Sequence, residues 1–141
     1  MGEFSIWHWL VVVIVLGLVV VPNVFYLLTL QRAFEAIDPP MRPMKPGLVW
    51  LFLIPVFNFV WAFFLVTYLK SGYEKMNAAG RLTSPTSAGF GVGIGYAICF
   101  ALCLIPGINL VAWIPAFVLW ILHWVQASDA RKLVLPAGES A

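Results

Sequence analysis

Two copies of one apolar pattern punctuate this sequence: LIPVFNFVW at residues 53–61 and LIPGINLVAW at residues 104–113. Each copy places a proline three residues before an asparagine, as Pro55 and Asn58 in the first and Pro106 and Asn109 in the second. A proline removes one backbone hydrogen bond of a helix and bends it, and an asparagine side chain can bond the carbonyl that the proline leaves free. The repeat therefore predicts two structurally equivalent Pro-x-x-Asn bends.

Long apolar segments surround these bends. They cover about residues 6–30, 48–69, 88–105 and 108–126, and a polar tail follows over residues 127–141. Of the 141 residues, 62% are hydrophobic and 10% charged, whereas soluble proteins average about 45–50% and about 25%. This composition excludes an ordinary soluble enzyme, a disordered protein and a nucleic-acid binder. We expect an all-α polytopic membrane protein, a single membrane domain with three to four transmembrane helices.

The connections between the segments add detail. Pro106-Gly107 joins the last two segments so tightly that they should form an antiparallel helical hairpin. The first segment carries its own bend residues, Pro22 and Asn23, and its leader has no Lys or Arg, so we expect it to stay as a membrane anchor. The loop over residues 31–47 contains four prolines and is expected to be a stiff, extended connector.

Two topologies remain open. With four spans, loop 70–87 and the tail put five Lys and Arg on one side and loop 31–47 puts three on the other, which favours both termini inside. If segment 48–69 is instead a re-entrant hairpin bent at 55–58, all eight Lys and Arg lie on one side and the N-terminus on the other. The charge count favours the second arrangement. The length of segment 48–69 favours the first, because each arm of a re-entrant hairpin reaches only part-way into the bilayer.

Two histidines lie among tryptophans, His8 in Trp7-His8-Trp9 and His123 before Trp124. Tryptophans gather at the membrane interface, so both histidines are expected near that level. In the four-span topology they share one side of the membrane, where they are candidate ligands of a bis-histidine haem or contacts of a quinone. In the re-entrant topology they lie on opposite faces.

Alternating glycines begin the third apolar segment, at Gly89, Gly91, Gly93 and Gly95. They form two Gly-x-x-x-Gly pairs, a spacing that lets helix backbones approach closely. We therefore expect helix packing through this face, within the chain or against a partner.

Asparagines are the other notable residues of the apolar segments, at positions 23, 58 and 109. They are candidates for hydrogen bonds between helices or for the lining of a pore. No Asp, Glu, Lys or Arg lies deep in an apolar segment, which argues against an ion-coupled transporter. No catalytic triad, metal-ligand cluster or phosphate-binding loop is recognisable, so we expect no enzyme.

Two resemblances extend this interpretation. Residues 4–12, FSIWHWLVV, resemble the N-terminal membrane segment of TatA-type twin-arginine translocase subunits, with His8 at the polar position of that family. Residues 42–51, RPMKPGLVWL, and 54–61, IPVFNFVW, are similar to a family of small multi-pass bacterial membrane proteins with no assigned activity. The second resemblance implies a protein of the bacterial inner (cytoplasmic) membrane.

These observations favour a non-catalytic function. We expect an accessory or scaffold subunit that packs in the lipid bilayer against other membrane subunits or against itself, with no nucleic-acid partner. One alternative is a small oligomeric channel or exporter lined by the asparagines and the glycine face. Another is a haem- or quinone-contacting subunit of an electron-transfer complex, which would use His8 and His123.

Overall fold

The computed structural model describes residues 5–136 and 138–139, and its elements are helices. They are α1 (Ile6–Glu35), η1 (Pro39–Met41), η2 (Pro46–Leu53), α2 (Phe57–Ala78), α3 (Phe90–Leu102) and α4 (Asn109–Lys132), where η denotes a 3-10 helix. Within the described residues, an isolated bridge between Leu82 and Val134 is the one β-type pairing. The all-α prediction is confirmed. Two helices, α1 and α4, are long and apolar enough to cross a membrane.

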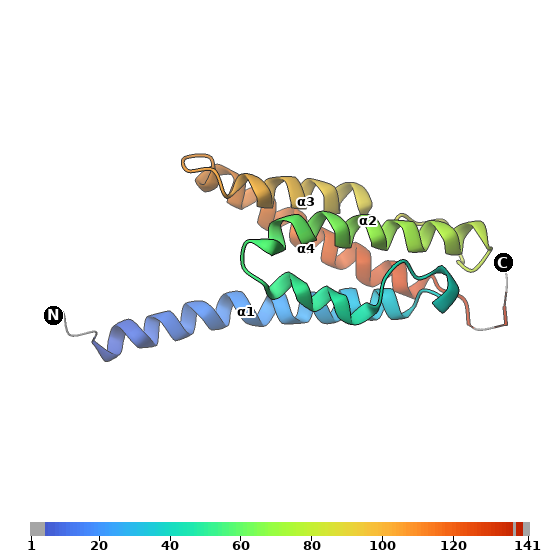
Figure 1. Cartoon of the computed structure of the whole chain (residues 1–141), viewed down its shortest axis with the longest axis horizontal. Helices are drawn as coiled ribbons and strands as arrows, with labels where there is room; N and C mark the ends of the chain where they lie inside the picture. Colours follow the sequence, from blue (N-terminus) through green and yellow to red (C-terminus); the bar gives the residue numbers. More distant parts are fainter. Residues whose placement is uncertain (1–4, 137, 140–141) are drawn as a thin grey trace.

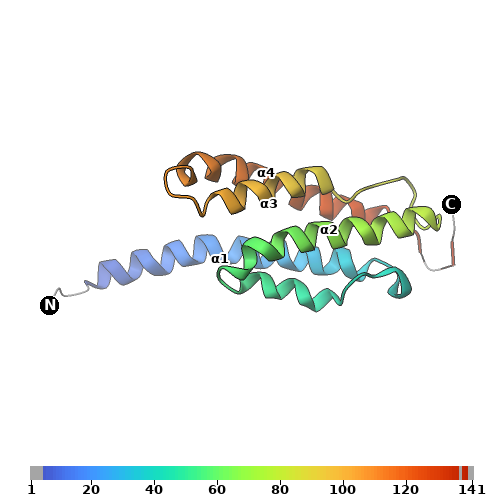
Figure 2. The same ribbon diagram turned by 45° about the horizontal axis from the view of Figure 1, so that its top comes forward.

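The helices form an elongated bundle (Figure 1). The first helix, α1, runs along its whole length, η2 returns beside it, and α2 reverses direction again. The last two helices, α3 and α4, form the antiparallel hairpin expected from the Pro106-Gly107 turn, and this hairpin lies on the other side of α2 from η2 (Figure 2). The C-terminal ends of α1, α2 and α4 therefore meet at one end of the bundle, opposite the N-terminus.

Segment 48–69 is not one continuous helix. Its first part belongs to η2, the chain reverses over residues 54–56, and the rest belongs to α2. The structure therefore does not confirm three to four spans, and the bend that the re-entrant alternative requires is present. The connector 31–47 also differs from expectation. Pro39 and Pro46 each begin a 3-10 helix instead of extended chain, because a proline at the first position of a helix gives up no hydrogen bond.

The two repeats adopt the same turn. The backbone N–H of Asn58 donates to the carbonyl of Ile54 at 3.1 Å, and that of Asn109 donates to the carbonyl of Ile105 at 3.1 Å. Each turn thus closes across its proline, at the tip of a helical hairpin (Figure 1). The predicted equivalence of the two Pro-x-x-Asn bends holds in three dimensions.

The residue after each proline has a positive φ, 67° at Val56 and 89° at Gly107. Glycine adopts this conformation freely, whereas a β-branched residue is strained in it. At Val56 the strain comes from a tight γ-turn, in which the N–H of Phe57 donates to the carbonyl of Pro55 at 2.7 Å. The first tip is therefore the strained copy of the repeat.

The sequence led us to expect that the asparagine side chains bond the carbonyls before the prolines. In the structure they do not. Asn109 accepts a hydrogen bond from the N–H of Leu110 at 2.8 Å, and the Oδ1 of Asn58 is buried without a partner. The reason is that the backbone N–H of each asparagine already occupies that carbonyl. In α1, which continues through Pro22, the amide of Asn23 donates to the carbonyl of Val19 at 2.8 Å.

The core occupies only part of the bundle. In α1 the buried residues begin at Tyr26 and continue to Phe34. The start of the same helix extends beyond the other elements (Figure 1). Further along, the aliphatic residues up to Val21 are largely exposed, and Leu18, for example, is 70% exposed. One half of α1 thus holds the fold together while the other half has an uncovered aliphatic surface.

Candidate functional site

A buried hydrogen bond joins the two longest helices at the centre of the core. The hydroxyl of Tyr26 on α1 lies 2.9 Å from Nδ1 of His123 on α4, and the imidazole is fully buried. The other ring nitrogen, Nε2, has no partner within the described residues. A Cβ built on Gly93 would lie 2.8 Å from Nε2, so the ring packs directly on the backbone of α3.

Aromatic rings surround Tyr26 on every side. Edge-to-face contacts join it to Phe52, Tyr96, Trp120 and Trp124, with centroid distances of 5.5–6.4 Å. Each such pair contributes about 0.5–1.5 kcal/mol beyond simple burial. Since these rings come from η2, α3 and α4, the cluster fixes the relative positions of both hairpins and α1.

Next to this cluster, a cavity of about 590 Å³ opens between the two hairpin tips and α1. Its walls are mostly apolar and include stacked rings, Phe59 on Phe100 at 4.4 Å and Trp113 on Phe117 at 5.5 Å. The lining residues with polar side-chain atoms are Asn23, Asn58, Tyr96, Cys103, Trp113 and Trp120. The Oδ1 of Asn58 and the Nε1 of Trp120 are buried without hydrogen-bond partners within the described residues.

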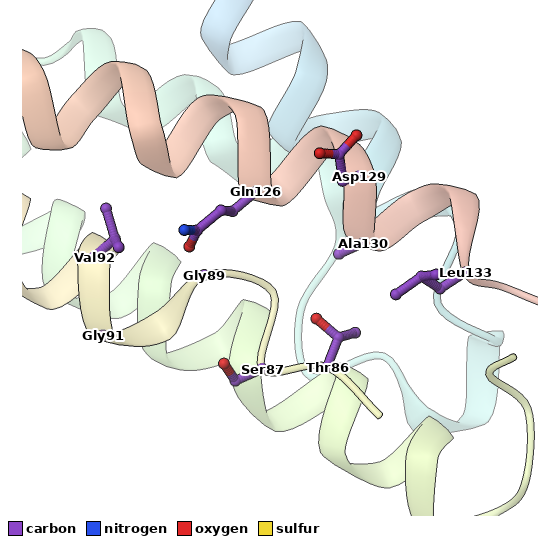
Figure 3. A pocket seen from close by; sticks show the side chains of 9 residues that line it. All are labelled: Thr86, Ser87, Gly89, Gly91, Val92, Gln126, Asp129, Ala130 and Leu133. Atoms are coloured by element: carbon purple, nitrogen blue, oxygen red, sulfur yellow. The ribbon is translucent and has the colours of Figure 1, made fainter. Parts of the chain in front are cut away.

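A second pocket of about 330 Å³ lies at the charged end, between the start of α3 and the end of α4 (Figure 3). Thr86 and Ser87 face it from the loop, and Gln126 points from α4 toward Gly89. Asp129 is the one ionisable residue that lines it, and its carboxylate pairs with Lys132 at 2.7 Å. This pocket brings together no pair of groups suited to proton transfer or nucleophilic attack.

Arg81 joins the connecting segments of the charged end. Its Nε donates to the carboxylate of Asp38 at 2.8 Å, and its other nitrogens donate to the carbonyls of Leu135, Pro136 and Glu139. The hydrogen bond to Asp38 raises the pKa of Arg81 above its ordinary value, so the guanidinium is charged at any physiological pH. One side chain thus links the first loop, the second loop and the tail.

The structure separates the two candidate histidines. His8 is exposed near the start of α1. His123 on α4 contacts Tyr26, which follows His8 by eighteen residues in the same continuous helix. At 1.5 Å per residue, eighteen residues span about 27 Å. The joint haem or quinone site of His8 and His123 therefore has no geometry to support it, because a continuous helix holds the two apart.

The glycine face of α3 packs against α4 at three of its four positions. A Cβ on Gly89, Gly93 or Gly95 would lie 2.8, 2.7 or 3.3 Å from a side chain of α4, whereas nothing lies within 4 Å of one on Gly91. The expected close helix packing is thus found within the chain for Gly89, Gly93 and Gly95, whereas Gly91 faces outward.

Sequence reasoning missed Tyr26 and Trp120, which centre the core and the cavity. The only available signal was a tyrosine and a tryptophan within otherwise aliphatic stretches, which fits an interfacial position equally well. No group of three or more His, Cys, Asp or Glu suited to a metal ion occurs in the part of the chain that the structure describes.

Comparison with known proteins adds no assignment. No protein-family model, curated protein or solved structure matches this chain. The resemblances to TatA-type segments and to the small multi-pass bacterial family therefore stay predictions.

Proposed function

We propose that this chain is a non-catalytic accessory subunit of the bacterial cytoplasmic membrane, which binds a larger membrane protein through the N-terminal half of α1. The observation that carries this proposal is the aliphatic surface of that half, where the large apolar residues from Leu10 to Val21 that are exposed have exposed fractions of 45–70%. The C-terminal half of α1 is packed in the core from Tyr26 to Phe34, and this packing holds the N-terminal half in a fixed direction.

The distribution of charge supports the membrane placement. All eight Lys and Arg belong to the last turn of α1, the first loop, the second half of α2, the loop after it, and the end of α4. These segments gather at one end of the bundle (Figure 1). By the positive-inside rule this end faces the cytoplasm, with the N-terminus on the opposite side. In this placement α1 crosses the bilayer and both hairpins enter it from the cytoplasmic side, tip first.

Gly17 favours a protein partner over lipid alone. It interrupts the aliphatic run of this half, and no other part of the chain that the structure describes lies within 4 Å of a Cβ built on it. A glycine inside a helix costs about 1 kcal/mol relative to alanine. In membranes, small residues at such positions let a second helix approach closely. We infer that the face of α1 around Gly17 is the contact surface.

Photo-crosslinking in the native host tests this proposal. A photoreactive amino acid at Val13 or at Val21 lies four residues from Gly17 and on its face, whereas one at Val15 lies on the opposite face. Val13 and Val15 are similarly accessible, 66% and 53% exposed, so Val15 is a matched control. We expect one discrete adduct with another membrane protein from Val13 and Val21 and none from Val15. Adducts with lipid alone at all three sites contradict the proposal, and adducts with a second copy support the channel alternative instead.

A further inference from the structure

The membrane placement proposed above puts the cavity between the hairpin tips near the centre of the bilayer. On α1 it is lined by residues between Leu18 and Asn23. These precede Arg32, the first charged residue of the cytoplasmic end, by 9 to 14 residues, or about 14–21 Å of helix. Half of a hydrocarbon core is about 15 Å. A ligand at this depth must be uncharged and soluble in the hydrocarbon itself.

The walls favour a flat ring over a flexible chain. The lining includes the stacked pairs Phe59–Phe100 and Trp113–Phe117, with Tyr96 stacked on Phe100 at 5.6 Å. Aromatic faces bind another flat ring by offset or edge-to-face contact. A volume of about 590 Å³ also falls within the range of about 300–1,000 Å³ usual for small-molecule sites.

Two walls carry polar atoms that the fold leaves unsatisfied. Trp120, 8% exposed on α4, has an indole N–H without an acceptor, and Asn58 at the start of α2 has an amide oxygen without a donor. A buried polar group without a partner costs about 1–3 kcal/mol. A ligand with an oxygen on each of two opposite edges removes both penalties, because one oxygen accepts from Trp120 and a hydroxyl on the other edge donates to Asn58.

We propose that this cavity binds a prenylated quinol, the reduced form of a membrane quinone, through Trp120 and Asn58 and without either histidine. The ring lies between the aromatic walls with its oxygens toward these two side chains. Its isoprenoid tail leaves past Leu18 and Leu53, both exposed residues of the lining. This inference concerns binding, and it stands apart from the contact of α1 with a partner protein.

The purified full-length chain in quinone-free lipid nanodiscs tests the inference, since no partner protein is needed there. The probe is 2,3-dimethoxy-5-methyl-6-decyl-1,4-benzoquinone in its oxidised and reduced forms, and decylbenzene is the matched compound without oxygens. We expect saturable one-to-one binding of the quinol, measured as adduct mass by native mass spectrometry, weaker binding of the oxidised quinone, which has no donor for Asn58, and none of decylbenzene.

Three variants separate the proposed contacts from general damage. Trp120→Phe keeps a ring but removes the N–H, and Asn58→Ala removes the amide, so each should weaken probe binding about tenfold. Trp61→Phe is the matched control, because its indole N–H donates to the carbonyl of Leu48 and its side chain does not line the cavity. Thermal melting without probe shows whether each variant is folded. Equal binding of decylbenzene, or unchanged affinity in both cavity variants, overturns the proposal and leaves lipid chains as the occupant.

Discussion

Replacing Gly93 by alanine tests how closely α3 packs on the buried histidine. A Cβ on Gly93 would lie 2.7 Å from Cδ2 of His123, 2.8 Å from its Nε2 and 2.7 Å from Cγ1 of Val66. The imidazole cannot easily retreat, because it is fully buried and held by Tyr26 at 2.9 Å. The added methyl group must therefore push α3 away from α4 or break the core hydrogen bond.

The size of the effect follows from two opposing terms. Alanine gains about 1 kcal/mol over glycine inside a helix. Overpacking a core costs about 1–3 kcal/mol, and with three contacts under 3.0 Å we use the upper half of that range. Gly93→Ala should therefore lower the free energy of unfolding by about 1–2 kcal/mol. Gly91→Ala is the matched control on the same helix, because its Cβ meets nothing within 4 Å. It should raise the free energy of unfolding by about 0.5–1 kcal/mol.

Reversible unfolding in mixed detergent micelles, followed by tryptophan fluorescence, measures both changes. The opposite signs carry the test, since any general effect of adding a methyl group to α3 acts on both variants alike. If Gly93→Ala is as stable as Gly91→Ala, then α3 does not pack on His123 as described. Adding Val66→Ala to Gly93→Ala should restore part of the lost stability, because it removes one of the close contacts.

Four further substitutions address the two turns, the core and the charged end. Val56→Gly should raise the free energy of unfolding by about 1 kcal/mol, because it relieves positive-φ strain at an exposed residue, and Gly107→Val should lower it by about 1–3 kcal/mol in the same assay. Tyr26→Phe should lower the free energy of unfolding by about 1–3 kcal/mol, because both ring nitrogens of His123 are then buried without partners. An unchanged free energy of unfolding would refute the core hydrogen bond. Arg81→Lys should speed tryptic cleavage after Lys132, which releases the tail, several-fold, because one ammonium group cannot hold both Asp38 and the tail carbonyls. Equal cleavage rates would show that Arg81 does not fix the tail.

Much of the fold can be predicted from the sequence. Apolar composition, the positions of the apolar segments and the Pro106-Gly107 turn predict an all-helical chain with a C-terminal hairpin, and all three rest on local rules. The equivalence of the two Pro-x-x-Asn copies is also predictable, because a proline followed by a tight turn has few ways to reconnect its backbone hydrogen bonds.

The path of segment 48–69 could not be decided from hydropathy. A straight helix and a bent hairpin bury the same apolar residues, so the difference lies in the backbone at Val56, whose positive φ no propensity would suggest. The cavity was equally hidden. It forms where Tyr96, Phe100 and Trp120 meet residues from three other elements, and only the tertiary structure brings those elements together.

In the proposed membrane placement, the distribution of charge favours one topology more strongly than segment length does. The length argument against a re-entrant hairpin assumes that each arm must reach across the bilayer unaided, but here η2 and α2 pack against α1 and α3, which cover their backbone. Once the arms are covered, a tip that stops part-way costs little, because it has no charged residue and exposes apolar side chains such as Ile54 and Val56. The second tip has the same properties at Ile105 and Ile108. A repeated Pro-x-x-Asn turn flanked by uncharged residues, with all Lys and Arg toward the far ends of the hairpin arms or beyond them, is therefore the sequence pattern that favours hairpins over spans in a chain of this kind.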